Sequence, residues 1–186
     1  MHEEILSEIN ESMEAKKNMD PEIISKIVDI IVDTYRNNKK VLIFGNGGSA
    51  ADAQHVAGEL VGRFKLERRA LACVALSTDT SIMTAYANDY SFDSVFVRQV
   101  EALANPGDVA IGISTSGNSK NVVKAIEKAK SIGAVTVGFT GISGGAMKSL
   151  CDICFCAPST NTPRVQECHE LAYHIICNLV EKKLFG

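Results

Sequence analysis

The segment Val41-Leu-Ile-Phe-Gly-Asn-Gly-Gly-Ser-Ala50 indicates the fold class of this chain. A short apolar run, 41–44, ends in a turn of small residues and continues into a helical pattern that extends to Gly62. The same order of apolar run, polar turn and helix returns at 71–76, 109–113, 135–139 and, more weakly, 153–157. Short, fully apolar strands that alternate with helices are typical of a parallel sheet covered on both faces. We therefore predict an α/β fold.

Helical patterns flank this predicted core on both sides. Residues 5–37 contain one break, at Asp20-Pro21, where Asp20 is suited to cap a new helix and Pro21 to its first position. The chain has 186 residues and shows no linker or low-complexity tract, which predicts a single domain. Its expected parts are N-terminal helices at 1–38, the α/β core at 40–158 and a C-terminal helix at 164–184.

Composition and charge narrow the class of partner. Hydrophobic residues make up 46% of the chain and charged residues 22%, which is usual for a globular protein. The net charge of -3 provides no general attraction for nucleic acid or anionic lipid. The sequence contains no apolar stretch long enough to span a bilayer and no secretion signal at its start. We expect a cytoplasmic protein that binds neither nucleic acid nor membrane.

Six cysteines raise the question of a metal site. Cys151, Cys154 and Cys156 are spaced somewhat like metal ligands, but no second cysteine pair follows to complete a tetrahedral site. A cytoplasmic setting favours reduced thiols, and free cysteine packs as a small hydrophobic residue. We interpret the cysteines as thiols of the core.

Two turns of small polar residues follow the first and third predicted strands, Asn46-Gly-Gly-Ser49 and Ser114-Thr-Ser-Gly-Asn-Ser119. Ligands of such folds bind at the carboxyl ends of the strands, where glycines admit backbone amides and helix N-termini favour a phosphate. The alternative is a tight turn with a helix cap, because Ser and Asn are favoured there. The segment from Gly45 to Ala50 also matches a dinucleotide fingerprint, but the acidic residue expected about 20 positions later would fall outside the second strand. We therefore favour a phosphate site.

Polar side chains on two predicted helices suggest a metal site. His55 and Glu59 are four residues apart and share one face of the helix after Gly48, although a solvated surface pair is the alternative. On the last helix, Gln166 and His174 also project to one side. These four side chains are a plausible ligand set for zinc. His169 and Glu170 compete for the same role, and their spacing does not exclude them.

A phosphate site with a nearby Glu and His suggests proton transfer on a sugar phosphate. Conversion of a ketose to an aldose removes a proton from C1, passes through an enediolate and returns a proton to C2. It requires a carboxylate or imidazole of suitable pKa and stabilisation of the developing oxyanion.

The chain resembles the phosphoheptose isomerases, enzymes with a sugar isomerase (SIS) domain that interconvert sedoheptulose 7-phosphate and D-glycero-D-manno-heptose 7-phosphate. The resemblance covers nearly the whole chain. Its most specific segments are Gly45-Asn-Gly-Gly-Ser49, Gln54-His55-x-x-x-Glu59-Leu60, Ala87-Asn-Asp89, Ser114-Thr-Ser-Gly-Asn-Ser119 and Thr162-Pro-Arg-Val-Gln166-Glu-x-His169, followed by His174. It implies a five-stranded parallel sheet of flavodoxin-like topology sandwiched by helices, and a homotetramer with active sites between subunits.

The resemblance also implies roles for individual residues. The phosphate site would comprise Ser49, Ser114, Thr115, Ser116 and Ser119, and the sugar would be lined by Asn46, Gly47, Gly48, Asn88, Asp89, Glu59 and Gln166. One zinc ion would be held by His55, Glu59, Gln166 and His174. Glu59 would be the catalytic base and His174 its partner acid or base. Some members have an aspartate where this chain has Pro163, so that aspartate's role does not carry over.

Two alternatives stay open. The first is a non-catalytic sugar-phosphate-binding SIS protein of the replication-initiator-associating type, a branch that lacks the Glu and the late His. This chain has both Glu59 and His174, which favours the enzyme. The second is an isomerase of another sugar phosphate, since specificity among sugars depends on pocket shape and hydroxyl contacts.

Overall fold

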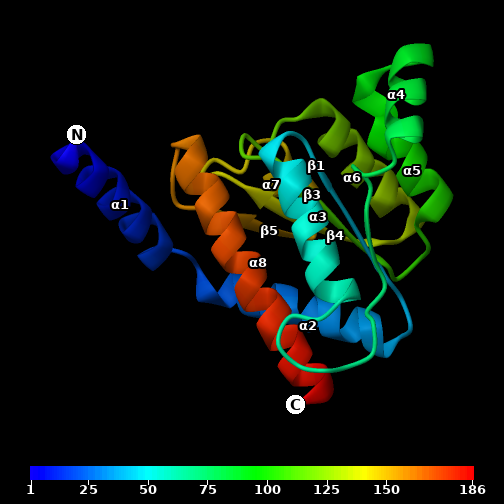
Figure 1. Cartoon of the computed structure of the whole chain (residues 1–186). Helices are drawn as coiled ribbons and strands as arrows, with labels where there is room; N and C mark the ends of the chain where they lie inside the picture. The colour runs from blue at the N-terminus through cyan, green and yellow to red at the C-terminus, as the bar shows by residue number, and fades with distance from the viewer.

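The computed structural model describes residues 1–186 and contains one five-stranded parallel sheet (Figure 1). The strand order is β2-β1-β3-β4-β5, which is the order of flavodoxin-like folds. All neighbouring strands are parallel, so their carboxyl ends share one edge of the sheet. The α/β prediction is confirmed, with the strands at β1 (Val41–Gly45), β2 (Cys73–Ala75), β3 (Val109–Ile113), β4 (Val135–Thr140) and β5 (Ile153–Cys156).

Helices cover both faces of the sheet, and the alternation of side chains along the strands creates two cores. Ile43 and Ile111 face a core shared with α2, α3 and α8, whereas Leu42 and Ala110 face a core shared with α5, α6 and α7. The helices are α1 (His2–Lys17), α2 (Pro21–Arg36), α3 (Gly48–Val61), α4 (Thr80–Asp89), α5 (Val95–Leu103), α6 (Lys120–Ile132), α7 (Met147–Leu150) and α8 (Thr162–Phe185), with a 3-10 turn, η1 (Phe92–Ser94). No helix is both long and apolar enough to cross a bilayer.

The boundaries of β2 and α8 differ by two residues or more from the expected ones. β2 has three residues rather than the six expected at 71–76, because the Leu71 N–H donates to the Leu60 carbonyl of α3 instead of a strand. α8 begins at Thr162, two residues before its expected start, with Pro163 in its first turn. At the N-terminus the predicted break is confirmed, since Asp20 caps α2 by accepting from the Glu22 N–H at 2.9 Å.

The cysteines are unpaired thiols, as predicted. Cys73, Cys151, Cys168 and Cys177 are buried, and the two on β5 are half-buried. Burial raises the pKa of Cys151 and of Cys177 to about 12, which favours the neutral thiol over the metal-binding thiolate.

Helices α3 and α8 lie side by side on one face of the sheet and run in the same direction (Figure 1). A buried ion pair fixes them to each other where α3 ends: Arg68 Nε donates to Glu181 Oε1 at 3.0 Å. Arg68 also donates to the carbonyls of Glu59 and Leu60 in the last turn of α3. Glu181 of α8 in turn accepts the backbone N–H groups of the segment that follows α3, at Phe64, Lys65 and Leu66.

We expect Glu181→Gln to destabilise the protein by about 3–5 kcal/mol, the cost of leaving a buried charge without its partner. Burial alone would raise the pKa of Glu181, but the three N–H donors and Arg68 outweigh it and hold this pKa below its usual value. The stabilisation is therefore present above the unfolded-state pKa and is lost as the pH falls through the folded-state pKa. Urea unfolding of both proteins between pH 7 and pH 3 should show the difference shrinking in acid. Glu101→Gln, which removes exposed ion pairs with Arg98 and Lys128, is the control and should cause a much smaller change.

Candidate functional site

The loop after β3 gathers three hydroxyl groups. Ser114 Oγ lies 2.9 Å from Ser119 Oγ and 3.4 Å from Ser116 Oγ. Gly117 between them has a φ of +69°, and a Cβ there would overlap the Gly144 carbonyl of the neighbouring loop. The loop therefore requires glycine, and it ends at the N-terminus of α6. Converging hydroxyls at a helix N-terminus form a site suited to a phosphate.

A cleft of about 350 Å³ opens beside this loop, at the carboxyl ends of β3, β4 and β5. Six of its ten lining residues carry hydroxyls, and none carries a charge, so it suits a polyhydroxylated ligand. The lining comprises Thr115, Ser116, Asn118, Gly141, Ile142, Ser143, Ser159, Thr160, Thr162 and Val165.

The loop after β1 is tied both to α6 and to α8. Asn46 exchanges two amide hydrogen bonds of 2.8 Å with Asn121 of α6. Gly47 has a φ of +55°, and Ser49 is buried in the first turn of α3. At Gly48 the Gln166 side chain lies so close that a Cβ on the glycine would overlap the Gln166 amide. Gln166 is thus held beside the predicted sugar and phosphate residues.

Two histidines meet halfway along α3 and α8. His55 Nε2 lies 3.1 Å from Glu59 Oε1 and 3.5 Å from His174 Nε2. Glu170 completes a group with both histidines in which the ligand atoms all lie within 4.8 Å of one another. His55 and Glu170 are exposed and His174 is half-buried, so solvent reaches the group. Of the four predicted zinc ligands, His55 contacts both Glu59 and His174, whereas no hydrogen bond joins Gln166 to either histidine.

The donors of His55, Glu170 and His174 suit a metal ion in chemistry and lie close enough together to share one, whereas the Glu59 carboxylate is outside this group and contacts only His55. Ligands at 2.0–2.1 Å from a tetrahedral zinc lie about 3.3 Å from each other, which is close to the two distances measured from His55 Nε2. Imidazole nitrogens and a carboxylate oxygen are common zinc ligands. The structure supplies two carboxylates, since Glu59 contacts His55 directly while Glu170 belongs to the three-residue group.

His169, which the sequence left open as a competitor, lies outside this site. Its side chain is buried beside Phe139 and Phe155, and its Nε2 lies 3.0 Å from the Thr140 carbonyl. Burial lowers the pKa of His169 to about 4, so it stays neutral within the core. Of the two competitors, only Glu170 reaches the two histidines.

Asn88 and Asp89 lie apart from the other predicted site residues. Both are exposed at the end of α4, and the Asn88 amide donates to Asp89 Oδ1 at 2.9 Å. α4 packs on α5 and η1, and none of its residues is buried. No hydrogen bond in the structure connects these two side chains to the loops after β1 and β3.

Tyr173 and Asp52 also belong to the surroundings of the histidines, and sequence reasoning assigned neither a role. The Tyr173 hydroxyl lies 3.1 Å from His55 Nδ1. Burial, and the negative charge of Glu170, raise the pKa of Asp52 to about 6. Tyr173 resembles an ordinary core aromatic in the sequence, and its position directly before His174 is the only local signal.

Comparison with known proteins identifies close relatives. The SIS domain family matches residues 5–141. A phosphoheptose isomerase of Geotalea daltonii is 51% identical over 189 residues, covering 100% of this chain and 98% of the relative. One of Helicobacter pylori is 52% identical over 181 residues, covering 97% and 91%. The solved structure of a phosphoheptose isomerase from Neisseria gonorrhoeae superposes with a TM-score of 0.92 at 40% identity, covering 97% of this chain and 98% of that one.

Two glycines of α3 provide a matched test of the contact with Gln166. In Gly48→Ala the new methyl group meets the flexible end of Gln166, so we expect the amide to move out of the site while the helix stays folded. Gly58 has open space around it, so Gly58→Ala should raise stability by up to about 1 kcal/mol and leave Gln166 in place. Crystal structures and thermal unfolding of both variants provide the measurement. A Gly48→Ala structure with an unmoved Gln166 would contradict the assigned contact.

Proposed function

The chain belongs to the phosphoheptose isomerase family of SIS-domain proteins, and on that premise we propose that it converts sedoheptulose 7-phosphate to D-glycero-D-manno-heptose 7-phosphate. The observation that carries the proposal is the contact of His55 with Glu59 and His174, on a helix that begins at the loop after β1. An acid–base group near an anion site is what ketose–aldose isomerisation requires.

Phosphate binding anchors the substrate far from the reacting carbons. In our proposal the hydroxyls of Ser114, Ser116 and Ser119 donate to the phosphate oxygens, with Thr115 and Ser49 beside them. The N-termini of α3 and α6 add free backbone N–H groups and the positive ends of their dipoles. Binding energy from this remote group holds C1 and C2 in position for reaction. Asn46, Gly47, Gly48 and Gln166 would line the sugar.

Proton transfer is assigned to Glu59 and His174. Glu59 removes a proton from C1 of the ketose, the electron pair forms the enediolate, and a proton returns to C2 to give the aldose. His174 is assigned as the partner acid or base that serves the sugar oxygens. A zinc ion held by His55, Glu59, Gln166 and His174 would supply Lewis-acid stabilisation of the oxyanion. A carboxylate bound to zinc is a poorer base, and Glu170 offers a second carboxylate that would leave Glu59 free for proton transfer.

We also assign the chain to a cytoplasmic homotetramer whose protomer, residues 1–186, is one SIS domain. On α1 the apolar side chains of Ile5, Leu6, Ile9 and Met13 are exposed, and α4 buries none of its residues. Such unpartnered faces indicate contact with other protein. A site completed between subunits also explains why Asn88 and Asp89 lie apart in one chain. Light scattering should give four times 20.0 kDa, and a monomer would contradict the assignment.

Two other functions remain distinguishable from this one. A sugar-phosphate-binding protein without turnover would need no base, whereas Glu59 and His174 both lie within 3.5 Å of His55 Nε2. An isomerase of another sugar phosphate would share the anion loops and differ in the hydroxyl-lined cleft.

The first experiment measures heptose 7-phosphate formation from sedoheptulose 7-phosphate after chelation and again after added zinc. We expect activity to disappear and to return, because the donors of α3 and α8 suit that ion. Activity that persists after confirmed metal removal would keep the isomerase and reject the zinc assignment. Binding of the sugar phosphate without turnover in either state would favour the binding protein or a different sugar.

Glu59→Gln tests the base. Gln is close in shape but cannot accept the C1 proton, so we expect turnover to fall by orders of magnitude while binding of inorganic phosphate is kept. Glu67→Gln is a matched control, since Glu67 is exposed and pairs only with Arg63 in the loop after α3. Steady-state kinetics and calorimetry provide both numbers. Full activity in Glu59→Gln would show that another group is the base.

A further inference from the structure

The two ring nitrogens of His55 face different surroundings. Nε2 faces Glu59 and His174, the donors assigned to a metal. Nδ1 faces the Tyr173 hydroxyl at 3.1 Å. In neutral imidazole only one nitrogen carries a proton, so the partner of Nδ1 decides whether Nε2 has a free lone pair.

A carboxylate without a hydrogen-bond partner lies near Tyr173. Asp52, one turn before His55 on α3, has a buried Oδ2 with no hydrogen-bond partner. Burial and the charge of Glu170 raise the pKa of Asp52, and burial and the charge of Asp52 raise the pKa of Tyr173, so the carboxylate lies near the hydroxyl. The charged groups around Asp52 also include Glu170, which repels it, and His55, which attracts it.

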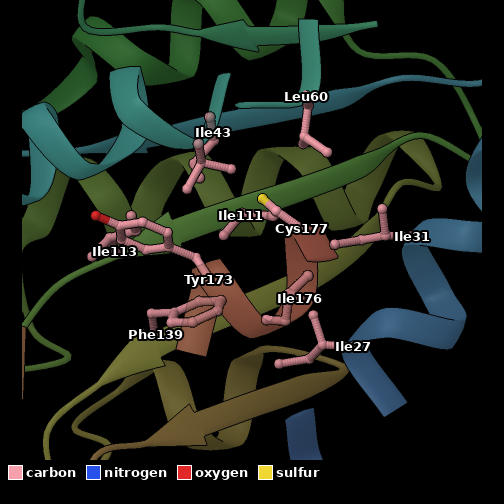
Figure 2. A pocket seen from close by; sticks show the side chains of 11 residues that line it. Ile27, Ile31, Ile43, Leu60, Ile111, Ile113, Phe139, Tyr173, Ile176 and Cys177 are labelled. Carbon is pink, nitrogen blue, oxygen red and sulfur yellow. The ribbon is translucent and has the colours of Figure 1, made fainter. Parts of the chain in front are cut away.

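The Tyr173 ring is held by packing, so its hydroxyl has few alternatives. The residue is 4% exposed. Figure 2 shows the ring beside Phe139, Ile113 and Ile176, with its oxygen at the margin of the group. These residues line a cavity of about 20 Å³ whose walls are entirely apolar and offer the hydroxyl no partner. The hydroxyl contacts His55, and the negative charges acting on it are those of Asp52 and Glu170.

We infer that Asp52 and Tyr173 are positioning residues that set the tautomer of His55: Asp52 accepts from the Tyr173 hydroxyl, whose oxygen accepts from His55 Nδ1–H, so that the Nε2 lone pair is directed at the metal. The inference rests on the proposed function only for the presence of the metal. Ligating histidines commonly donate their second N–H in this way, and loss of such a partner typically costs 10–100-fold in metal affinity.

Competition with a chromogenic chelator measures zinc affinity without any sugar substrate. We expect Tyr173→Phe and Asp52→Asn each to weaken zinc binding by about 10–100-fold. The double variant should be little weaker than either single variant, because both act through His55. Tyr35→Phe is the matched control: Tyr35 is 3% exposed, its hydroxyl donates only to the Ala72 carbonyl, and its removal should leave zinc affinity unchanged.

A second readout follows the proton itself. Nitrogen-15 NMR of the zinc-loaded protein should show His55 protonated at Nδ1, with a proton that exchanges slowly, and exchange should become fast in Tyr173→Phe. Wild-type zinc affinity and slow exchange in Tyr173→Phe would overturn the inference and leave the proposed function intact. Absence of zinc binding by the unmodified protein would overturn both the inference and the zinc assignment, while sugar-phosphate turnover would still test the isomerase.

Discussion

Glu181 is buried where α8 passes the end of α3, and it collects three backbone N–H groups and the Arg68 guanidinium. Arg68 in turn bonds the last carbonyls of α3. The two helices run in the same direction. This connection therefore also fixes their register, that is, which residue of α8 lies opposite each residue of α3. Gly48 meets Gln166 and His55 meets His174 in one consistent register. The site depends on that register more than on any single ligand.

The side chains between α3 and α8 bring several carboxyl groups close together, although like charges repel. Asp52, Glu59 and Glu170 place carboxyl groups around two imidazoles, and burial together with repulsion by Glu170 raises the pKa of Asp52. In water such charges would separate, but the packed helices keep them together. A divalent cation would offset the repulsion and strengthen the pairing of α3 with α8 at the same time. The hydroxyl-lined cleft has no charged residue in its lining. The negative charge of a bound phosphate would therefore be stabilised by the helix N-termini.

The sequence predicted the sheet because each strand is a short apolar run with a clear end, as at 109–113, where prediction and structure coincide. It also predicted that His55 and Glu59 lie next to each other, because residues four apart in a helix share one face. It did not predict the Arg68–Glu181 pair, since 113 residues separate the two and neither has a local signal. The exclusion of His169 from the site likewise depends on the packing of α8 against β4 and β5, which periodicity alone does not specify.

The separation of the two histidines along the chain has a consequence for synthesis. His55 and His174 are 119 residues apart, and all five strands lie before His174. On a translating ribosome the sheet is therefore complete in sequence before the second histidine exists. A metal ion cannot template the early fold through this pair. A metal ion held by this pair would therefore act only on the docking of the last helix against a sheet whose sequence is already complete.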